Sequence, residues 1–76
     1  MSEWIVSKVG VLGGKACVRG TRISVEHIME LLASGASRED VLRAHPQIGA
    51  EGFAAALQYA ARSLKNEVVW ELELPA

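Results

Sequence analysis

The hydrophobic positions of this chain repeat with a helical period through its middle part. After Ser24, a residue type that caps helix starts, apolar side chains recur every three or four positions and predict a helix that Gly35 ends. Its apolar stripe consists of Val25, Ile28, Met29 and Leu32. The segment Ser37-Arg38-Glu39-Asp40 has the pattern of a capping box, with Asp in place of the usual Glu, and predicts a second helix. That helix ends by about Ala44, because a His-Pro pair follows and proline disfavours a helical residue before it.

A third and longer helix is predicted from about Ala50 to Lys65, with Gly49 as its N-cap. Ile48 and Phe53 have the spacing of a hydrophobic staple, which sets the direction in which the chain enters the helix. The side chains expected to face the core are Phe53, Leu57, Ala60, Ala61 and Leu64. Those expected to face outward are Ala55, Gln58, Tyr59 and Arg62.

Both ends of the chain have features of β-structure. Near the N-terminus, the glycines predict two tight turns joined by a short strand from Ala16 to Val18. Beyond Asn66, apolar and polar residues alternate with a period of two, which predicts a strand with one buried face. Because a lone strand is unstable, we expect it to pair with the segment around Trp4, with a second subunit or with the sheet edge of a partner.

Together these elements predict one domain of mainly α class. Residues 1–23 form a β and turn arm with a short hairpin, residues 24–65 a three-helix core, and residues 66–76 a C-terminal strand. The second and third helices, joined by a tight turn, have helix-turn-helix form, so the core resembles a winged-helix or homeodomain-like unit.

The composition of the chain predicts that it forms an oligomer. A chain of 76 residues that is 50% hydrophobic has more apolar side chains than a domain of this size readily buries. We therefore expect a homodimer or a higher homo-oligomer. The residues expected at the interface are Trp4, Trp70, Leu72 and Leu74. A single cysteine suits a reducing compartment, and no apolar run approaches the roughly 20 residues of a membrane span, so we expect a cytoplasmic protein without a membrane partner.

The charges are distributed unevenly, although the formal net charge is only -1. Residues 1–22 carry four basic side chains and one acidic one, whereas residues 67–76 carry three acidic side chains and no basic one. The stretch from Gly13 to Ile23 combines turn glycines with Lys15, Arg19 and Arg22, and has no carboxylate nearby in sequence. It is therefore a candidate site for an anionic partner. The alternative is that these cations are merely solvated on two turns.

A helix-turn-helix would place the third helix in the major groove of DNA. Gln58 and Arg62 could then contact base edges, and Lys65 could reach a phosphate. The alternative, that these side chains only solvate an outer face, stays open.

Catalytic sites are not supported by residue spacing. Val9 and Ala16 stand where a phosphate-binding loop would need glycine and Ser or Thr. Cys17, His27 and His45 lack the clustering of a zinc site, and Cys17 lies in a short apolar strand that favours a buried, inert thiol. We expect no catalytic residues, no metal and no cofactor, and thus no enzyme.

The stretch Gly13-Gly14-Lys15-Ala16-Cys17-Val18-Arg19-Gly20-Thr21-Arg22-Ile23, followed by a helix, Ser34-Gly35-Ala36-Ser37 and an Ala-rich helix, closely resembles the DUF433 family over roughly residues 3–65. Family members usually have proline at the position of Ala16 and Ser or Thr at that of Gly49; neither change removes a charge. The resemblance implies an antitoxin of a type II toxin-antitoxin pair. Such an antitoxin would neutralise a PIN-like ribonuclease by binding it, with Arg19 and Arg22 as leading contacts, and could bind operator DNA to repress its own operon. The alternative is a protein-binding module of the same fold that does not bind DNA.

Overall fold

The computed structural model describes residues 3–10 and 12–65. Its elements in chain order are β1 (Ile5–Val6), η1 (Leu12–Gly14), β2 (Cys17–Val18), α1 (Val25–Ala33), α2 (Arg38–Ala44), η2 (Pro46–Ile48) and α3 (Gly49–Ser63). The fold is therefore mainly helical with a short N-terminal hairpin, as the sequence predicts. The predicted C-terminal strand lies outside the described residues.

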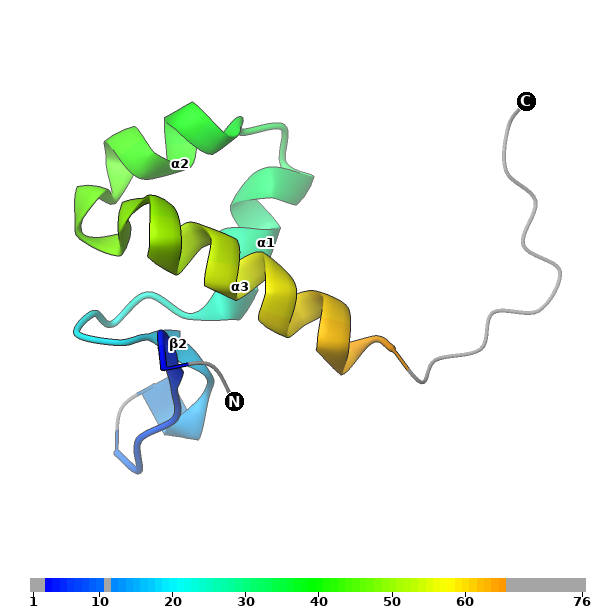
Figure 1. Cartoon of the computed structure of the whole chain (residues 1–76). Helices are drawn as coiled ribbons and strands as arrows, with labels where there is room; N and C mark the ends of the chain where they lie inside the picture. The colour runs from blue at the N-terminus through cyan, green and yellow to red at the C-terminus, as the bar shows by residue number, and fades with distance from the viewer. Residues whose placement is uncertain (1–2, 11, 66–76) are drawn as a thin grey trace, which may run out of the picture.

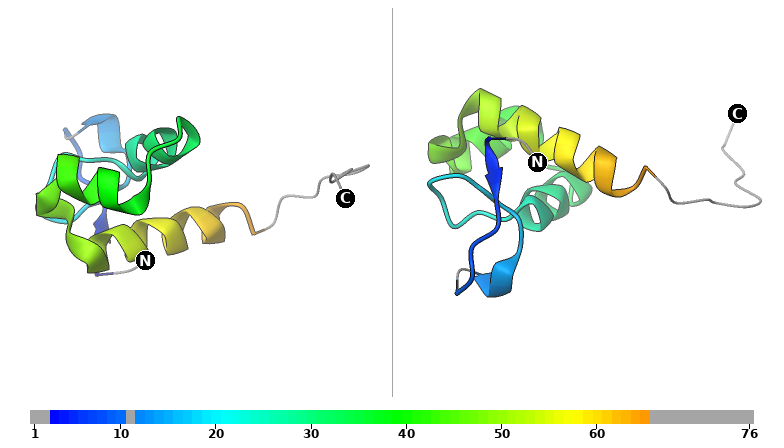
Figure 2. Two further views of the ribbon diagram at one scale, coloured as in Figure 1. Left: turned by 90° about the horizontal axis from the view of Figure 1, so that it is seen from above. Right: turned by 60° about the horizontal axis from the view of Figure 1, so that its bottom comes forward.

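The helix α3 is the element around which the others are arranged. It contacts α1, α2, η2 and both strands. In Figure 1, α3 runs between α2 above it and the β-hairpin below it, with α1 behind. Both further views show the C-terminal end of α3 projecting beyond the other elements (Figure 2).

The ends of the helices follow the capping residues of the sequence. Ser24 precedes α1, and its hydroxyl accepts a hydrogen bond from the backbone N–H of His27 at 2.9 Å. The capping box of α2 is complete: the Ser37 hydroxyl accepts from the Asp40 N–H at 3.0 Å, and the Asp40 carboxylate accepts from the Ser37 N–H at 2.9 Å. Gly35 has φ 105°, a left-handed conformation that glycine adopts easily after a helix. These local predictions are confirmed.

The start of α3 differs from the prediction. The helix begins at Gly49, and its N-cap position falls on Ile48 rather than on Gly49. Gly49 has φ 72° and ψ 163°, a region of backbone space that is almost restricted to glycine. The 3-10 turn η2 directly precedes α3, and the extended backbone of Gly49 separates the two coiled segments, so Gly49 still marks the change of direction that the sequence predicts.

The strand β2 is paired on both sides. It runs antiparallel to β1, with Ile5 opposite Val18 and Val6 opposite Cys17. On its other side, the Val18 N–H donates to the Ile23 carbonyl at 3.0 Å, and Cys17 forms a bridge with Ser24. The residues that lead into α1 thus act as a third extended segment beside β2.

The core is aliphatic except for Phe53, and strands and helices both contribute to it. It consists of Ile5, Val18, Ile23, Val25, Ile28, Val41, Ile48, Phe53, Ala55 and Ala56. Trp4, Met29 and Tyr59 are partly buried and pack against this cluster.

The prediction of which face of α3 is buried is wrong in part. Phe53 is buried as expected, but Leu57 and Leu64 are 39% and 58% exposed, and Ala61 is exposed as well. Ala55, predicted to face outward, is 4% exposed. The prediction followed the largest apolar side chains, whereas the buried face contains the smallest ones.

Gly52 explains why small residues lie on the buried face. A Cβ atom added there would lie 2.9 Å from Cγ1 of Val18 and 3.2 Å from Cγ2 of Ile48. Val18 is 1% exposed and β-branched, so its side chain has little freedom to move aside. The first turns of α3 therefore approach β2 closely because residue 52 has no side chain.

We predict that Gly52→Ala lowers the free energy of unfolding. Overpacking costs about 1 to 3 kcal/mol, which exceeds the gain of about 1 kcal/mol in helix propensity. In a Val18→Ala background the same substitution should cost less, because the clashing Cγ1 atom is absent. Urea unfolding followed by circular dichroism measures all four proteins, and an equal cost in both backgrounds would contradict the proposed clash.

A second prediction concerns the capping box of α2. The hydrogen bonds from the Ser37 backbone and side chain lower the pKa of Asp40 below its ordinary value of 3.8. The stabilisation by the ionised carboxylate is therefore present above that value and is lost as the pH falls through the lower pKa of the folded state. Thermal unfolding from pH 7 down to about pH 2 should show the wild type losing its advantage over Asp40→Asn. An advantage that does not change with pH would refute this role of the charge.

Candidate functional site

Two of the three cations of the glycine-rich stretch, Arg19 and Arg22, flank a hydrogen-bonded turn that follows β2. The segment Val18 to Thr21 is a tight turn in which the Thr21 N–H donates to the Val18 carbonyl at 3.0 Å. Gly20 occupies the third position with φ 80°, as a type II turn requires. The Thr21 hydroxyl donates to the same carbonyl at 2.8 Å and accepts from the Ile23 N–H at 3.0 Å. The loop therefore holds Arg19 and Arg22 at fixed places on its two sides.

Lys15 is not available as a free cation. Its Nζ lies 2.6 Å from Oε1 of Glu26, which stands in the first turn of α1. The hydrogen bond to Glu26 and the charge of this carboxylate raise the pKa of Lys15. The expectation that no carboxylate neutralises these cations is wrong for Lys15, because folding brings α1 beside it.

Arg19 is engaged with the N-terminal strand region. Its guanidinium carbon lies 5.3 Å from the ring centroid of Trp4, a cation–π arrangement. The Arg19 N–H also donates to the Trp4 carbonyl at 2.8 Å. Trp4, predicted to lie at an interface, is partly buried against the core. Arg19 and Trp4 thus brace the loop against β1.

Arg22 is the cation of this stretch that is left for an external anion. It is exposed, and it makes no ion pair with any residue among 3–10 and 12–65. It borders a hollow of about 300 Å³ beside β2. The hollow is lined by Val6, Lys8, Cys17, Gly20, Thr21 and Arg22. We call it the basic hollow.

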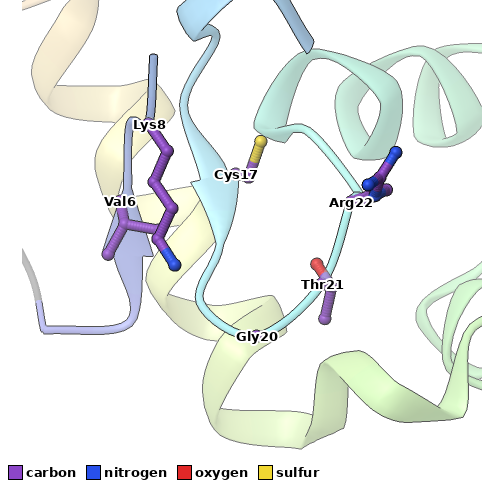
Figure 3. A pocket seen from close by; sticks show the side chains of 6 residues that line it. All are labelled: Val6, Lys8, Cys17, Gly20, Thr21 and Arg22. Carbon is purple, nitrogen blue, oxygen red and sulfur yellow. The ribbon is translucent and has the colours of Figure 1, made fainter. Parts of the chain in front are cut away.

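Figure 3 shows Lys8 and Arg22 on opposite sides of the basic hollow, with β2 and Cys17 between them and the end of the Arg22 side chain turned away from Lys8. Its lining contains two cations and no carboxylate. The two positive charges attract a carboxylate or phosphate to this part of the surface. Sequence reasoning missed Lys8; the signal was its position two residues after Val6, on the same side of an extended segment.

A second hollow, of about 410 Å³, also borders Arg22 but differs in charge. Its lining includes Lys15 together with Glu26 and Glu30. The carboxylates balance the cations on this side of the loop. An anion is therefore attracted to the basic hollow and not to this one.

The cations predicted on the third helix form a separate group. Gln58, Arg62 and Lys65 are exposed, and their spacing of four and three residues places them along one face of α3 and the turn that follows it. None of them lines the basic hollow. The predicted anion-binding residues therefore do not form one site.

Two histidines that are far apart in sequence are neighbours in the fold. The rings of His27 and His45 meet edge to face with their centroids 5.6 Å apart. Within the described residues, no group of three or more His, Cys, Asp or Glu side chains is arranged to hold a metal ion. Cys17 is 2% exposed, so its predicted burial is confirmed, and its Sγ donates to the Lys15 carbonyl at 3.2 Å.

Two further expectations concern the C-terminus and the membrane. Trp70, Leu72 and Leu74, predicted as interface residues, lie outside the described residues. Among the helices that the structure describes, none combines the length and the apolar character needed to cross a lipid bilayer.

Known proteins resemble this chain in sequence and in structure. It is 40% identical over 58 residues to the uncharacterized protein y4eO of Sinorhizobium fredii, matching 76% of this chain but only 26% of that protein. This chain thus spans about a quarter of the length of that relative. The crystal structure of a DUF433 member protein from Anabaena variabilis is similar with a TM-score of 0.77 and 32% identity, covering 82% of this chain and 61% of that one.

The family assignment rests on the larger part of the fold. Residues 5–60 match the family described as "Protein of unknown function (DUF433)". The matched region runs from β1 to the last turn of α3 and includes the loop with Arg19 and Arg22. With a structural neighbour from the same family, this extent establishes that the chain belongs to the DUF433 family.

Proposed function

We propose that this protein is an antitoxin of a type II toxin-antitoxin pair, which neutralises a PIN-like ribonuclease by binding it through the basic hollow. The resemblance of the glycine-rich stretch suggests the class of partner. The observation that carries the proposal is the placement of Lys8 and Arg22 on two sides of a hollow without a carboxylate. Such a site attracts a surface rich in carboxylates.

The chemistry of the expected partner fits this site. PIN-like nucleases hold Mg²⁺ with clustered carboxylates, and a guanidinium group forms two parallel hydrogen bonds with a carboxylate. Arg22, exposed at the edge of the hollow, would compete with both the metal ion and the RNA for these groups. Arg19 has a different role in this proposal, since its stacking on Trp4 holds the loop in position.

Repression of its own operon is the less supported half of the antitoxin function. In helix-turn-helix proteins, the N-terminal residues of the recognition helix contact the base edges. The corresponding exposed residues of α3 include Ala50, Glu51 and Ala54, which supply no hydrogen-bond donor from a side chain and one negative charge. This surface favours the alternative of a protein-binding module that does not bind DNA.

We predict that Lys8→Ala with Arg22→Ala weakens binding to the proposed PIN-like nuclease by about tenfold or more, because charge-assisted interactions are lost. Isothermal titration calorimetry measures the affinity. The matched control is Arg38→Ala with Arg43→Ala, which also removes two exposed cations but lies on α2. Equal losses in both double variants would reduce the effect to net charge and refute the site.

For DNA, we predict only weak, sequence-independent binding to the region upstream of the gene, with a dissociation constant of about 10⁻⁴ to 10⁻⁶ M at physiological salt. A gel shift at several salt concentrations tests this, with Arg62→Ala and Lys65→Ala as probes of α3. Tight binding that both substitutions abolish would instead support operon repression through the third helix.

A further inference from the structure

The outward face of α3 carries an apolar stripe that the described residues 3–10 and 12–65 leave uncovered. Its members are Ala50, Ala54, Leu57, Ala61 and Leu64, and all of them are exposed. They are spaced alternately by four and three residues, the average period of 3.5 with which helices pack against each other in coiled coils. Leu57 and Leu64 leave 39% and 58% of their surface uncovered within the described chain.

This stripe continues onto a neighbouring apolar surface at the C-terminal end of α3. Leu64 also lines a hollow of about 430 Å³ between α1 and α3, together with Met29 and Tyr59. The end of α3 projects beyond the rest of the molecule, and residues 61–65 are all exposed (Figure 2). As far as the described residues go, the apolar surface is therefore accessible along the whole helix.

The charges beside the stripe are arranged asymmetrically. Between Gly49 and Lys65 the charged residues are Glu51, Arg62 and Lys65. All three are exposed, with the carboxylate in the first turn and both cations at the other end. A helix with this distribution is complementary to a copy of itself that runs in the opposite direction.

We infer that the apolar stripe of α3 binds the same stripe of a second copy of this chain, with the two helices antiparallel about a twofold axis near Leu57. A twofold interface uses the same patch on both subunits, so one self-complementary stripe is sufficient. This contact does not involve the basic hollow and is independent of the proposed nuclease.

Shape and charge both favour the antiparallel direction. It places Ala50 opposite Leu64 of the partner subunit, so that a small side chain meets a large one. It also places Glu51 near Lys65 of the partner subunit, an attractive pair, and opposes the two helix dipoles favourably. A parallel pair would set Leu64 against Leu64 of the partner subunit and would keep Glu51 far from Lys65 of the partner subunit. The alanines let the two backbones approach closely.

The expected dimer is weak. The 15 residues of α3 span about 22 Å, and one helix face of this length buries less surface than a standard interface. We therefore expect association in the micromolar range, so that the subunit is monomeric when dilute and dimeric when concentrated.

Sedimentation velocity over a concentration series tests the interface. Leu57→Lys should raise the dissociation constant of the dimer about tenfold or more, since it places a charge in the apolar contact. Val9→Lys is the matched control, because Val9 is fully exposed in the segment between β1 and η1, away from α3 in sequence, and should leave association unchanged. Circular dichroism verifies that both variants remain folded. A monomer at all concentrations, or a dimer that Leu57→Lys does not weaken, overturns the inference.

A charge exchange tests the direction of the helices. Lys65→Glu alone should weaken the dimer, and adding Glu51→Lys should restore it, because the pair is then reversed but again attractive. In a parallel dimer Glu51 and Lys65 of the partner subunit lie at opposite ends of the helix pair, so the exchange would bring no such loss and recovery. That result would overturn the antiparallel arrangement.

Discussion

The fold depends on the close contact between α3 and β2 at Gly52. Val18, the residue that faces this glycine, also pairs with Ile5 of β1 and closes the loop by its hydrogen bonds to Ile23 and Thr21. One buried side chain thus joins the longest helix, the hairpin and the cationic loop. Because protein interiors are densely packed, displacing α3 by a methyl group would disturb all three.

The internal contacts of the fold also determine which basic side chains are available to bind an external anion. Lys15 is neutralised by Glu26, and Arg19 lies over Trp4, so both serve the fold. Arg22 and Lys8 have no ion pair among the described residues and border the same hollow. The capacity to bind an anion therefore depends on which basic side chains are not engaged by contacts within the protein. The number of basic residues in the loop does not determine it.

The sequence predicted the local structure well and the tertiary structure less well. Ser24, Gly35 and the Ser37–Asp40 box act within a few residues of themselves, so the pattern alone identified the ends of α1 and α2. The buried face of α3 depends on a neighbour more than thirty residues away, and small side chains gave no signal of it. The same limit explains why Lys8 was missed as a member of the site and why the pairing of Lys15 was not foreseen.

The burial of Cys17 has a consequence for observing this protein. Its thiol is 2% exposed, and it lies in β2, the strand that holds the basic loop in place. A thiol reagent such as a maleimide can reach this sulfur only when β2 separates from its neighbours. The native cysteine is thus a built-in reporter: its rate of alkylation measures how often the hairpin opens, without any engineered label.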